Sequence, residues 1–418
     1  MPVCRARHHR VLTRVAFAFT FDRSTRAASH HHEPAQPRPA WFTDDLQALA
    51  DTATRFAERE CLPHDARWRA QRRGDRDIWN KAGAAGLLCA SIPEAHGGGG
   101  GHFGHEVAIT QALALKMAGG FSNSVHSGIV AHYILRYGTE WQKQRWLPKM
   151  ASGEIVSAIA MTEPGCGTDL QAVRTRAATD GDHYVINGAK TFITNGFHAN
   201  LVCIVCRTGE AAGGKGLSLV MAEVDGLPGF RRGRLLDKVG QHTIDTCELF
   251  FEDMRVPRSH LLGTEEGQGF RQLMEQLPQE RLIIAVGGIA TLQRAIHETL
   301  AYVKQRQVFG QPLMQMQNTR FVLAECQTLA TVARCFVDEC VGRALRGELD
   351  NATSAMAKWW VSDTVGKVVD ACLQLFGGYG YMNDYPIARL YADQRVGRIY
   401  GGSNEVMKEL IARAMDKA

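Results

Sequence analysis

The sequence predicts an α+β protein with a helical N-terminal domain, a small antiparallel β-domain and a helical C-terminal domain. Hydrophobic residues recur at helical spacing over residues 41–157, form short β-type runs over 158–266, and return to helical spacing over 267–418. Strands and helices do not alternate, which argues against a parallel α/β sheet. A chain of 418 residues is long enough for several hydrophobic cores, so we expect one large multidomain subunit.

Residues 1–40 are predicted to form a disordered extension. They contain seven arginines, two acidic residues and four prolines, without sustained periodicity. The net charge of +5 therefore lies entirely in this segment, and the neutral remainder does not favour nucleic acid as a partner. An arginine-rich, acid-poor start is typical of an organelle transit peptide. The alternatives are an unstructured extension and an over-long gene start.

The N-terminal domain begins with "DDLQALADTATRFAERECL", whose apolar residues are spaced by three and four, with Asp44 as the expected N-cap. Five consecutive glycines, Gly97 to Gly101, are too flexible for a helix or strand and predict an inter-helix loop.

The middle domain is predicted from several short β runs. "HYVINGAKTFITNG" is interpreted as two strands joined by a hairpin turn at Asn187 and Gly188. "NLVCIVCRT", "GLSLVMAEV" and "TCELFFEDMRVP" supply further strands. Cys203 and Cys206 form a C-x-x-C pair, but residues three apart in a strand point to opposite faces. We therefore expect two buried strand cysteines and no metal site.

Cysteine content and hydropathy bear on the compartment. The 11 scattered cysteines suggest reduced thiols in an intracellular protein, and no apolar run approaches the roughly 20 residues of a membrane span, so stable membrane insertion is not expected. We expect a bacterial cytoplasmic location, with the mitochondrial matrix as the alternative.

Two glycine-containing segments are candidates for cofactor binding. Gly377, Gly378 and Gly380 follow the long helical run "SAMAKWWVSDTVGKVVDACLQLF" rather than a strand, so a Rossmann fingerprint is rejected. They form either a helical C-cap or a loop that meets a pyrophosphate. "AIAMTEPGCGTDL" offers the hydroxyls of Thr162 and Thr168 to a polar cofactor edge, or forms a capped turn.

Four motifs, taken together, resemble the acyl-CoA dehydrogenase family: "AMTEPGCGTDLQA", "TFITNG", "YVKQRQVFGQPL" and "QLFGGYGYMNDYPIARLYAD". They occur in the order of the family and span nearly all of the chain beyond residue 40. The resemblance implies an FAD-dependent homotetramer with a four-helix C-terminal domain. It further implies oxidation of acyl-CoA to trans-2-enoyl-CoA in fatty-acid β-oxidation, with electrons passing to an electron-transfer flavoprotein.

The same resemblance implies the binding residues. Phe192 and Thr194 would contact the isoalloxazine, whereas Arg306 would help to hold the adenine half of a neighbouring subunit's FAD. The implied cofactor-binding residues are Thr162, Thr168, Phe192, Ile193, Thr194, Arg306, Phe309, Gln317, Gln374, Gly377, Gly378, Ser403 and Glu405. The implied substrate-binding residues are Thr168, Arg271, Arg281, Gly401 and Gly402.

The expected catalytic base is Glu280. Many relatives carry a glutamate in "IYEG", but this chain reads "IYGG", with Gly401 in that place. Glu280, in "LPQERLIIAVGG", shares a helical face with Leu277 and Ile284, so the pattern points it inward, where a carboxylate is basic. The alternative is a surface charge paired with Arg281. Isovaleryl- and long-chain-type members of the family place their base at this position, and the N–H of Gly401 would donate to the thioester carbonyl.

The acyl group is predicted to be long. "LPQERL", "VHSGIV", "AMAKWW" and "YGGSNEVMKELIAR" are most similar to the long-chain type of the family, and Gly287, Gly288 and Gly401 are expected to leave space for an extended tail. Isovaleryl-CoA or another branched acyl-CoA is the runner-up. An acyl-CoA oxidase and a non-catalytic relative, such as an assembly factor or a DNA-binding protein, are the other readings.

Overall fold

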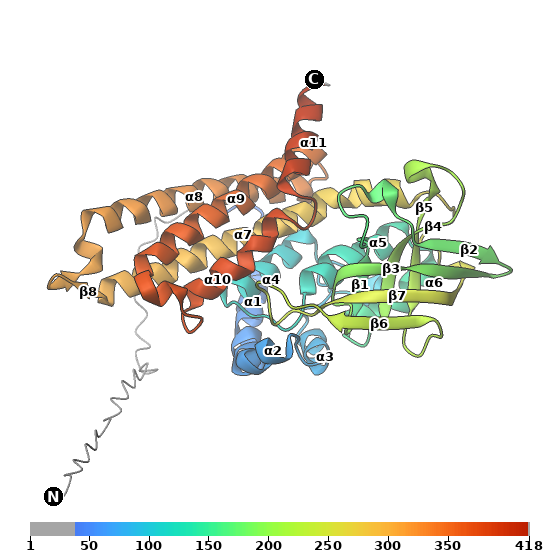
Figure 1. Ribbon diagram of the computed structural model, residues 1–418, viewed down its shortest axis with the longest axis horizontal. Helices are drawn as coiled ribbons and strands as arrows, with labels where there is room; N and C mark the ends of the chain where they lie inside the picture. Colours follow the sequence, from blue (N-terminus) through green and yellow to red (C-terminus); the bar gives the residue numbers. More distant parts are fainter. Residues whose placement is uncertain (1–37, 417–418) are drawn as a thin grey trace, which may run out of the picture. The chain divides into compact units, whose positions relative to one another are not determined.

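The computed structural model describes residues 38–416 (Figure 1). The predicted extension over residues 1–40 lies almost wholly outside the described residues and stays a prediction. Residues 40–416 show the expected order of helices, a β-sheet and helices. The exact domain limits given above remain predictions.

The N-terminal part is helical and contains two π-helical turns. Its α-helices are α1 (Asp44–Phe56), α2 (Asp65–Gln71), α3 (Asp77–Ala84), α4 (Phe103–Leu115), α5 (Ala131–Tyr137) and α6 (Glu140–Ala151). The π-helical turns are Ala57–Cys61 and Ser124–Val130, and short 3₁₀ turns lie at Leu62–His64 and Glu94–His96. The predicted N-cap was off by one residue, because α1 starts at Asp44 and the extended residue before it is Thr43.

The five-glycine run does form the loop before α4, but it is not free to flex. The N–H groups of Gly98 and Gly100 donate to Pro93 O and Ile92 O, at 3.2 and 2.8 Å. A Cβ at Gly98 would lie 2.3 Å from Ile92 O, so the glycine is needed for a close backbone approach.

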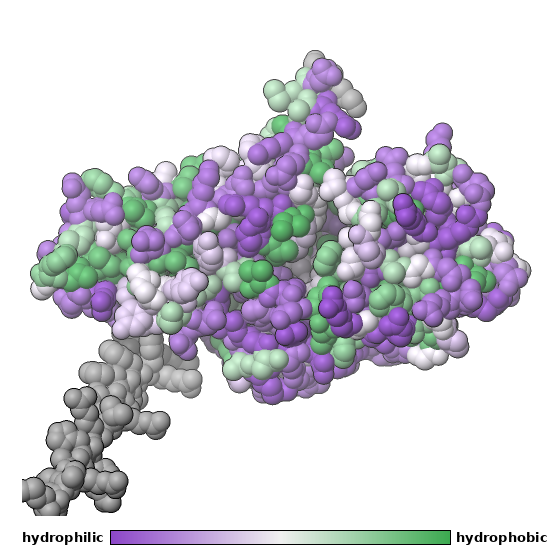
Figure 2. Space-filling view, viewed as in Figure 1, coloured by the Kyte–Doolittle hydropathy of each residue, from purple (hydrophilic) through white to green (hydrophobic). Residues whose placement is uncertain are grey.

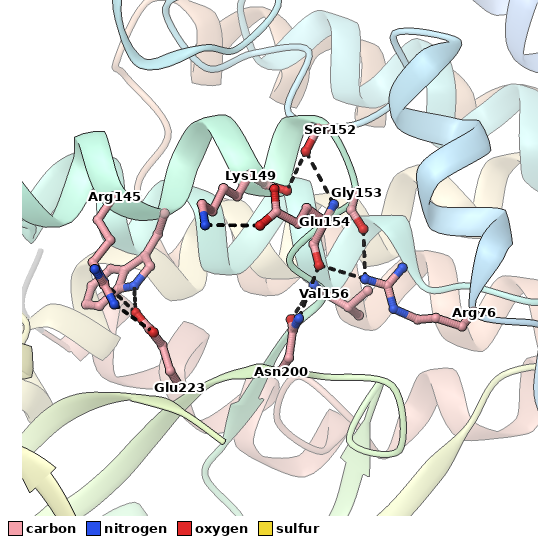
Figure 3. Close-up of polar contacts among 10 residues, drawn as sticks. Arg76, Arg145, Lys149, Ser152, Gly153, Glu154, Val156, Asn200 and Glu223 are labelled. Atoms are coloured by element: carbon pink, nitrogen blue, oxygen red, sulfur yellow. Dashed lines mark hydrogen bonds and ion pairs between the residues drawn. The ribbon is translucent and has the colours of Figure 1, made fainter. Parts of the chain in front are cut away.

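Polar contacts fasten α6 to the sheet (Figure 3). Arg145 Nε and Trp146 Nε1 both donate to Glu223 at the end of strand β5 (Leu217–Glu223), at 2.6 and 2.7 Å. Beyond the C-terminal end of α6, just before β1, Asn200 Oδ1 accepts a hydrogen bond from Val156 N at 2.8 Å. The helical and β parts are thereby held in one orientation around the segment that separates them.

The sheet has the strand order β1-β4-β2-β3-β7-β6, with β5 paired to β4. Most pairs are antiparallel, as predicted, but β1 and β2 run parallel to β4. The strands are β1 (Ser157–Ala160), β2 (Arg176–Asp180), β3 (His183–Thr194), β4 (Leu201–Arg207), β5 (Leu217–Glu223), β6 (Phe230–Leu235) and β7 (Thr246–Pro257).

The predicted hairpin at Asn187 and Gly188 is wrong. Both residues lie inside β3, and the tight turn is at residues 181–182, between β2 and β3. The ladder with β7 shifts register at Asn187, which exchanges hydrogen bonds with Asp253. A Cβ at Gly188 would lie 2.5 Å from Thr175 Oγ1, so this glycine permits a close approach rather than a turn.

The two faces of β4 belong to different cores. Cys203 packs with helices α5 and α6, whereas Cys206 packs in the core on the other face of the sheet. Both thiols are buried and unpaired, as the strand interpretation predicted.

The C-terminal part contains three long helices and two shorter ones. They are α7 (Gly269–Gln305), α8 (Gln317–Leu345), α9 (Asn351–Phe376), α10 (Pro386–Gln394) and α11 (Asn404–Asp416). Helices α7 to α10 share one core, which confirms a four-helix unit, and α11 packs its first turns on α9 (Figure 1). The short hairpin β8 (Gln307–Val308) and β9 (Gln311–Pro312) connects α7 with α8. None of the helices within residues 38–416 is both long and apolar enough to cross a membrane.

Candidate active site

Glu280 lies on α7 with its carboxylate removed from water. Its side chain is 6% exposed, and Tyr133 of α5 donates from Oη to Glu280 Oε1 at 2.7 Å. Burial raises the pKa of Glu280 to about 7, although the hydrogen bond from Tyr133 and the charge of Arg281 act in the opposite direction. A carboxyl group with this pKa is suited to take up a proton near neutral pH.

Gly401 faces α7 one turn beyond Glu280. Its φ is +64°, and a Cβ added there would lie 2.4 Å from Ile284 Cδ1. The prediction that the missing side chain at Gly401 leaves space is therefore wrong, because Ile284 fills the place that a side chain would need. A side chain at position 401 would need a positive φ and would displace the end of the Ile284 side chain, whereas the buried Glu280 carboxylate is already accommodated.

The two glycines on the next turn of α7 differ in their surroundings. No atom lies within 4 Å of a Cβ built at Gly287, which is half-buried on the same face as Glu280. A Cβ at Gly288, in contrast, would lie 2.5 Å from Val361 Cγ1. The expectation of open space thus holds for Gly287 and is wrong for Gly288, which serves the close packing of α7 on α9.

The two arginines predicted to bind substrate lie apart. Arg281 is buried, and its Nη1 donates to Asn351 Oδ1 at 2.9 Å. Arg271 is nine residues before Glu280, on the opposite face of α7, and is exposed and paired with Glu275 at 3.0 Å. The structure does not bring Arg271 together with the carboxylate.

The segments "MTEPGCGT" and "TFITNG" of the β-domain lie side by side. Thr191 N donates to Thr162 O at 2.9 Å, which places the segment "MTEPGCGT" beside "TFITNG". Phe192 has a φ of +60° and is 66% exposed, so its ring is presented to solvent. Thr194 is half-buried and Thr168 exposed, whereas the Ile193 side chain is buried in the sheet, so only the Ile193 backbone is available to a ligand.

A buried lysine, not found from the sequence, fixes the first of these segments. Lys190 of β3 is 1% exposed, and its Nζ donates to Met161 O and Glu163 Oε1, both at 2.9 Å. The Glu163 carboxylate also accepts the N–H groups of residues 174 and 175.

A cavity of about 470 Å³ lies at the far end of α7. Arg306, Gln374, Gly377 and Gly378 line it together, as predicted for one binding site. The guanidinium of Arg306 lies over the ring of Tyr379, 5.7 Å from its centroid. The remaining two residues predicted for this site, Phe309 and Gln317, lie outside its lining, and Phe309 is 97% exposed.

Hydrophobic residues gather on the surface at this end of the helical domain, around β8 (Figure 2). The exposed large side chains there are Phe309, Phe321, Tyr379, Tyr381 and Met382. Along α7, 26 residues separate Glu280 from Arg306, which corresponds to about 39 Å at 1.5 Å per residue.

The last predicted residues lie at the start of α11. Ser403 accepts a weak hydrogen bond from Val406 N at 3.5 Å, and Glu405 is exposed. Asn404, which sequence reasoning missed, is instead buried between them and hydrogen bonded to Lys358 at 2.9 Å. A signal for Lys358 does exist in the sequence, because Ser354, Lys358 and Ser362 form a polar stripe on an otherwise apolar helix.

The site residues form two groups, each suited to one half of FAD. The exposed ring of Phe192, beside backbone and hydroxyl donors, suits the isoalloxazine. The cavity lined by an arginine, a glutamine and two glycines suits the nucleotide half. The two groups lie on different elements, one on the β-domain and one at the C-terminal end of α7.

Comparison with known proteins identifies the family. The models of the acyl-CoA dehydrogenase N-terminal, middle and C-terminal domains match residues 43–154, 158–254 and 267–416. The mitochondrial long-chain specific acyl-CoA dehydrogenase of pig (Sus scrofa) is 44% identical over 374 residues, 89% of this chain and 86% of the pig protein. Mitochondrial isovaleryl-CoA dehydrogenase of rice (Oryza sativa subsp. japonica) is 34% identical, over 90% of this chain and 92% of its own length.

A solved structure extends the likeness to three dimensions. The acyl-CoA dehydrogenase of Geobacillus kaustophilus superposes with a TM-score of 0.88 at 43% identity, covering 91% of this chain and all of that one. The fold class, the reaction class and the cofactor expected from the motifs are thereby confirmed. The chain belongs to the acyl-CoA dehydrogenase family, whose members use FAD to dehydrogenate acyl-CoA.

Proposed function

We propose that this enzyme oxidises long-chain acyl-CoA to trans-2-enoyl-CoA, with Glu280 as the base. The main support is the buried carboxyl group of Glu280, whose pKa is raised to about 7. It lies on a helix face that continues to the open space at Gly287. The α-proton goes to the Glu280 carboxylate while the β-hydrogen leaves with its electron pair as a hydride. Bound FAD supplies the acceptor for that hydride.

The protein groups around Glu280 support this role. Exclusion of water makes the carboxylate a stronger base than a surface glutamate, and Tyr133 orients it through the 2.7 Å hydrogen bond. Gly401 lies one helical turn away, where its N–H is available to the thioester carbonyl as negative charge develops on the oxygen.

Two observations favour a long acyl chain. The long-chain specific relatives are 44% identical, whereas the isovaleryl- and isobutyryl-CoA relatives are 31–35% identical. The space at Gly287 continues the Glu280 face of α7 away from the base, as an extended tail requires. A branched acyl-CoA is the second candidate, because those relatives match over the same length.

We further propose that the cavity at Arg306 holds the nucleotide half of a neighbouring subunit's FAD, within a homotetramer. The distance of about 39 Å along α7 and the hydrophobic surface around β8 both support this arrangement. An electron-transfer flavoprotein is the proposed electron acceptor, on the grounds of family membership. Residues 162–168 and 192–194 are the proposed flavin contacts, with Ser403 and Glu405 closing the pocket.

The test is the visible spectrum of the purified holoenzyme under anaerobic conditions, before and after palmitoyl-CoA or isovaleryl-CoA. Bleaching of the flavin by palmitoyl-CoA is expected. Bleaching by isovaleryl-CoA alone would move the assignment to a branched substrate, and no bleaching by either would refute both.

Glu280→Gln tests the base within the same assay. This variant is expected to bind FAD and to lose flavin reduction, because the amide cannot take up the proton. Glu275→Gln is the matched control on the same helix, since Glu275 is half-buried and paired with Arg271 and Tyr137, away from Glu280. Near-parental reduction by Glu280→Gln would show that another group is the base.

A further inference from the structure

Lys358 is a fully buried lysine on α9 that the reaction described so far does not use. Its Nζ donates to Gly402 O at 2.6 Å and to Asn404 Oδ1 at 2.9 Å. Within residues 38–416 no carboxylate lies at ion-pair distance, and Asp363 and Glu405 act on Lys358 only through their more distant charges. Its direct partners are therefore the segment that follows Gly401.

The segment after Tyr400 contains two adjacent glycines, and neighbouring helices hold it in place. Gly401 and Gly402 have φ values of +64° and +90°, a conformation that glycine adopts at low cost. Two adjacent glycines leave the backbone many conformations unless other groups fix it. Ile284 limits Gly401 from the α7 side, and Lys358 binds the Gly402 carbonyl from the α9 side.

Asn404 extends the attachment along α9. Its Nδ2 donates to Ser362 Oγ at 3.0 Å and to Asp363 Oδ1 at 2.9 Å. Asp363 in turn pairs with Arg398 at 3.1 Å, just before the glycines. Both ends of the segment are thus fastened to α9 within about one and a half turns of Lys358.

A buried cation without a carboxylate partner is costly. Burial, together with the charge of the buried Arg281, lowers the pKa of Lys358 to about 8. An apolar side chain there would avoid the cost of burying the charge but would leave Gly402 O and Asn404 Oδ1 without their donor. The two hydrogen bonds of Lys358 therefore fix the segment that follows Gly401.

We propose that Lys358 is a positioning residue that holds the Gly401–Gly402 segment beside Glu280, so that the Gly401 N–H meets the thioester carbonyl. The inference rests on the proposed function, because it takes Glu280 as the base and the Gly401 N–H as the donor. Lys358 touches neither substrate nor cofactor and acts through the backbone of Gly402.

The experiment compares Lys358→Met with the parent holoenzyme. Methionine preserves much of the volume and removes the donors, so Gly402 O loses its partner. We expect unchanged FAD content, flavin reduction at saturating palmitoyl-CoA slowed by about 10- to 100-fold, and a KM within about 3-fold, because a misplaced donor acts mainly on the transition state. The C=O stretching band of bound trans-2-hexadecenoyl-CoA, labelled with ¹³C at C1, should move to higher wavenumber as polarisation is lost.

Lys190→Met is the matched control. Lys190 is equally buried and also donates to one carbonyl and one side-chain oxygen, but it fixes residues 161–163 of the β-domain. Its loss is expected to lower FAD content and, in the fraction that keeps FAD, to leave the carbonyl band in place. The two lysine variants should therefore fail in different ways.

The proposal is overturned if Lys358→Met has an unshifted carbonyl band or a parental reduction rate, or if it merely repeats the Lys190→Met pattern. Should Lys358→Met not fold, Ser362→Ala removes a weaker attachment of Asn404. It must then slow reduction by a few fold with FAD content unchanged, and parental behaviour again overturns the proposal. A parent enzyme that no acyl-CoA reduces would instead refute the proposed function.

Discussion

Tyr133→Phe should shift the pH dependence of flavin reduction upward. The substitution keeps the buried ring and removes only the Oη that donates to Glu280 Oε1 at 2.7 Å. That hydrogen bond favours the carboxylate, so its loss must raise the pKa of Glu280 above its present value of about 7.

The size of the shift follows from the type of bond. A hydrogen bond to a charged group contributes about 1.5–3 kcal/mol, and 1.36 kcal/mol corresponds to one pKa unit, which gives a rise of about 1–2 units. At pH 7 the deprotonated fraction of Glu280 then falls from about one half to about 1–10%, so reduction slows by roughly 5- to 50-fold. Above the new pKa the rate should recover.

The assay is stopped-flow flavin reduction by palmitoyl-CoA from pH 6 to 10, with Tyr137→Phe as control. Tyr137 is on the same helix, but its Oη donates to Glu275 Oε2 at 2.8 Å, so its loss should not move the midpoint. An unmoved midpoint in Tyr133→Phe would refute the link between this hydrogen bond and the base. An equal loss of rate at every pH would point to a structural defect instead.

Three further predictions concern stability and chain length. Glu280→Gln should be more stable than the parent by about 3 kcal/mol at pH 8 and equally stable near pH 4.5. The pKa of Glu280 is raised from 4.5 to about 7, so the parent loses stability as pH rises through this window. Urea unfolding at both pH values measures the difference in the free energy of unfolding. Gly401→Ala should cost about 1–3 kcal/mol through its positive φ and the clash with Ile284, and a double-mutant cycle with Ile284→Ala should show the clash as coupling. Gly287→Leu should lower kcat/KM for palmitoyl-CoA by at least about 10-fold while butyryl-CoA changes less than about 3-fold; equal losses for both would place the acyl tail elsewhere.

The order of domains and the burial of Glu280 could be predicted because they depend on local patterns. The spacing of hydrophobic residues changes from helical to strand-like and back along the chain. Glu280 lies in line with the apolar residues of one helical face. Tyr133 could not be predicted as its partner, because the two residues are 147 positions apart and meet only through the packing of α5 on α7.

The errors arose where tertiary contacts overrode local propensity. Asn-Gly favours a hairpin turn locally, but the long pairing of β3 with β7 keeps Asn187 and Gly188 inside a strand. Likewise, the glycines at 288 and 401 suggested empty space, whereas neighbouring side chains from α9 and α7 occupy it. A missing side chain in the sequence does not show which atoms take its place.

The length of α7 ties the proposed sites of different subunits to one another. One helix carries the proposed base in its first half and, about 39 Å away, an arginine proposed to contact the cofactor of a neighbour. A chain with Glu280→Gln and a chain altered at Arg306 would therefore each be defective, yet their mixed assembly would contain some sites with both parts intact. Recovery of activity on mixing two inactive variants would mark the enzyme as one whose smallest working unit is larger than a single chain.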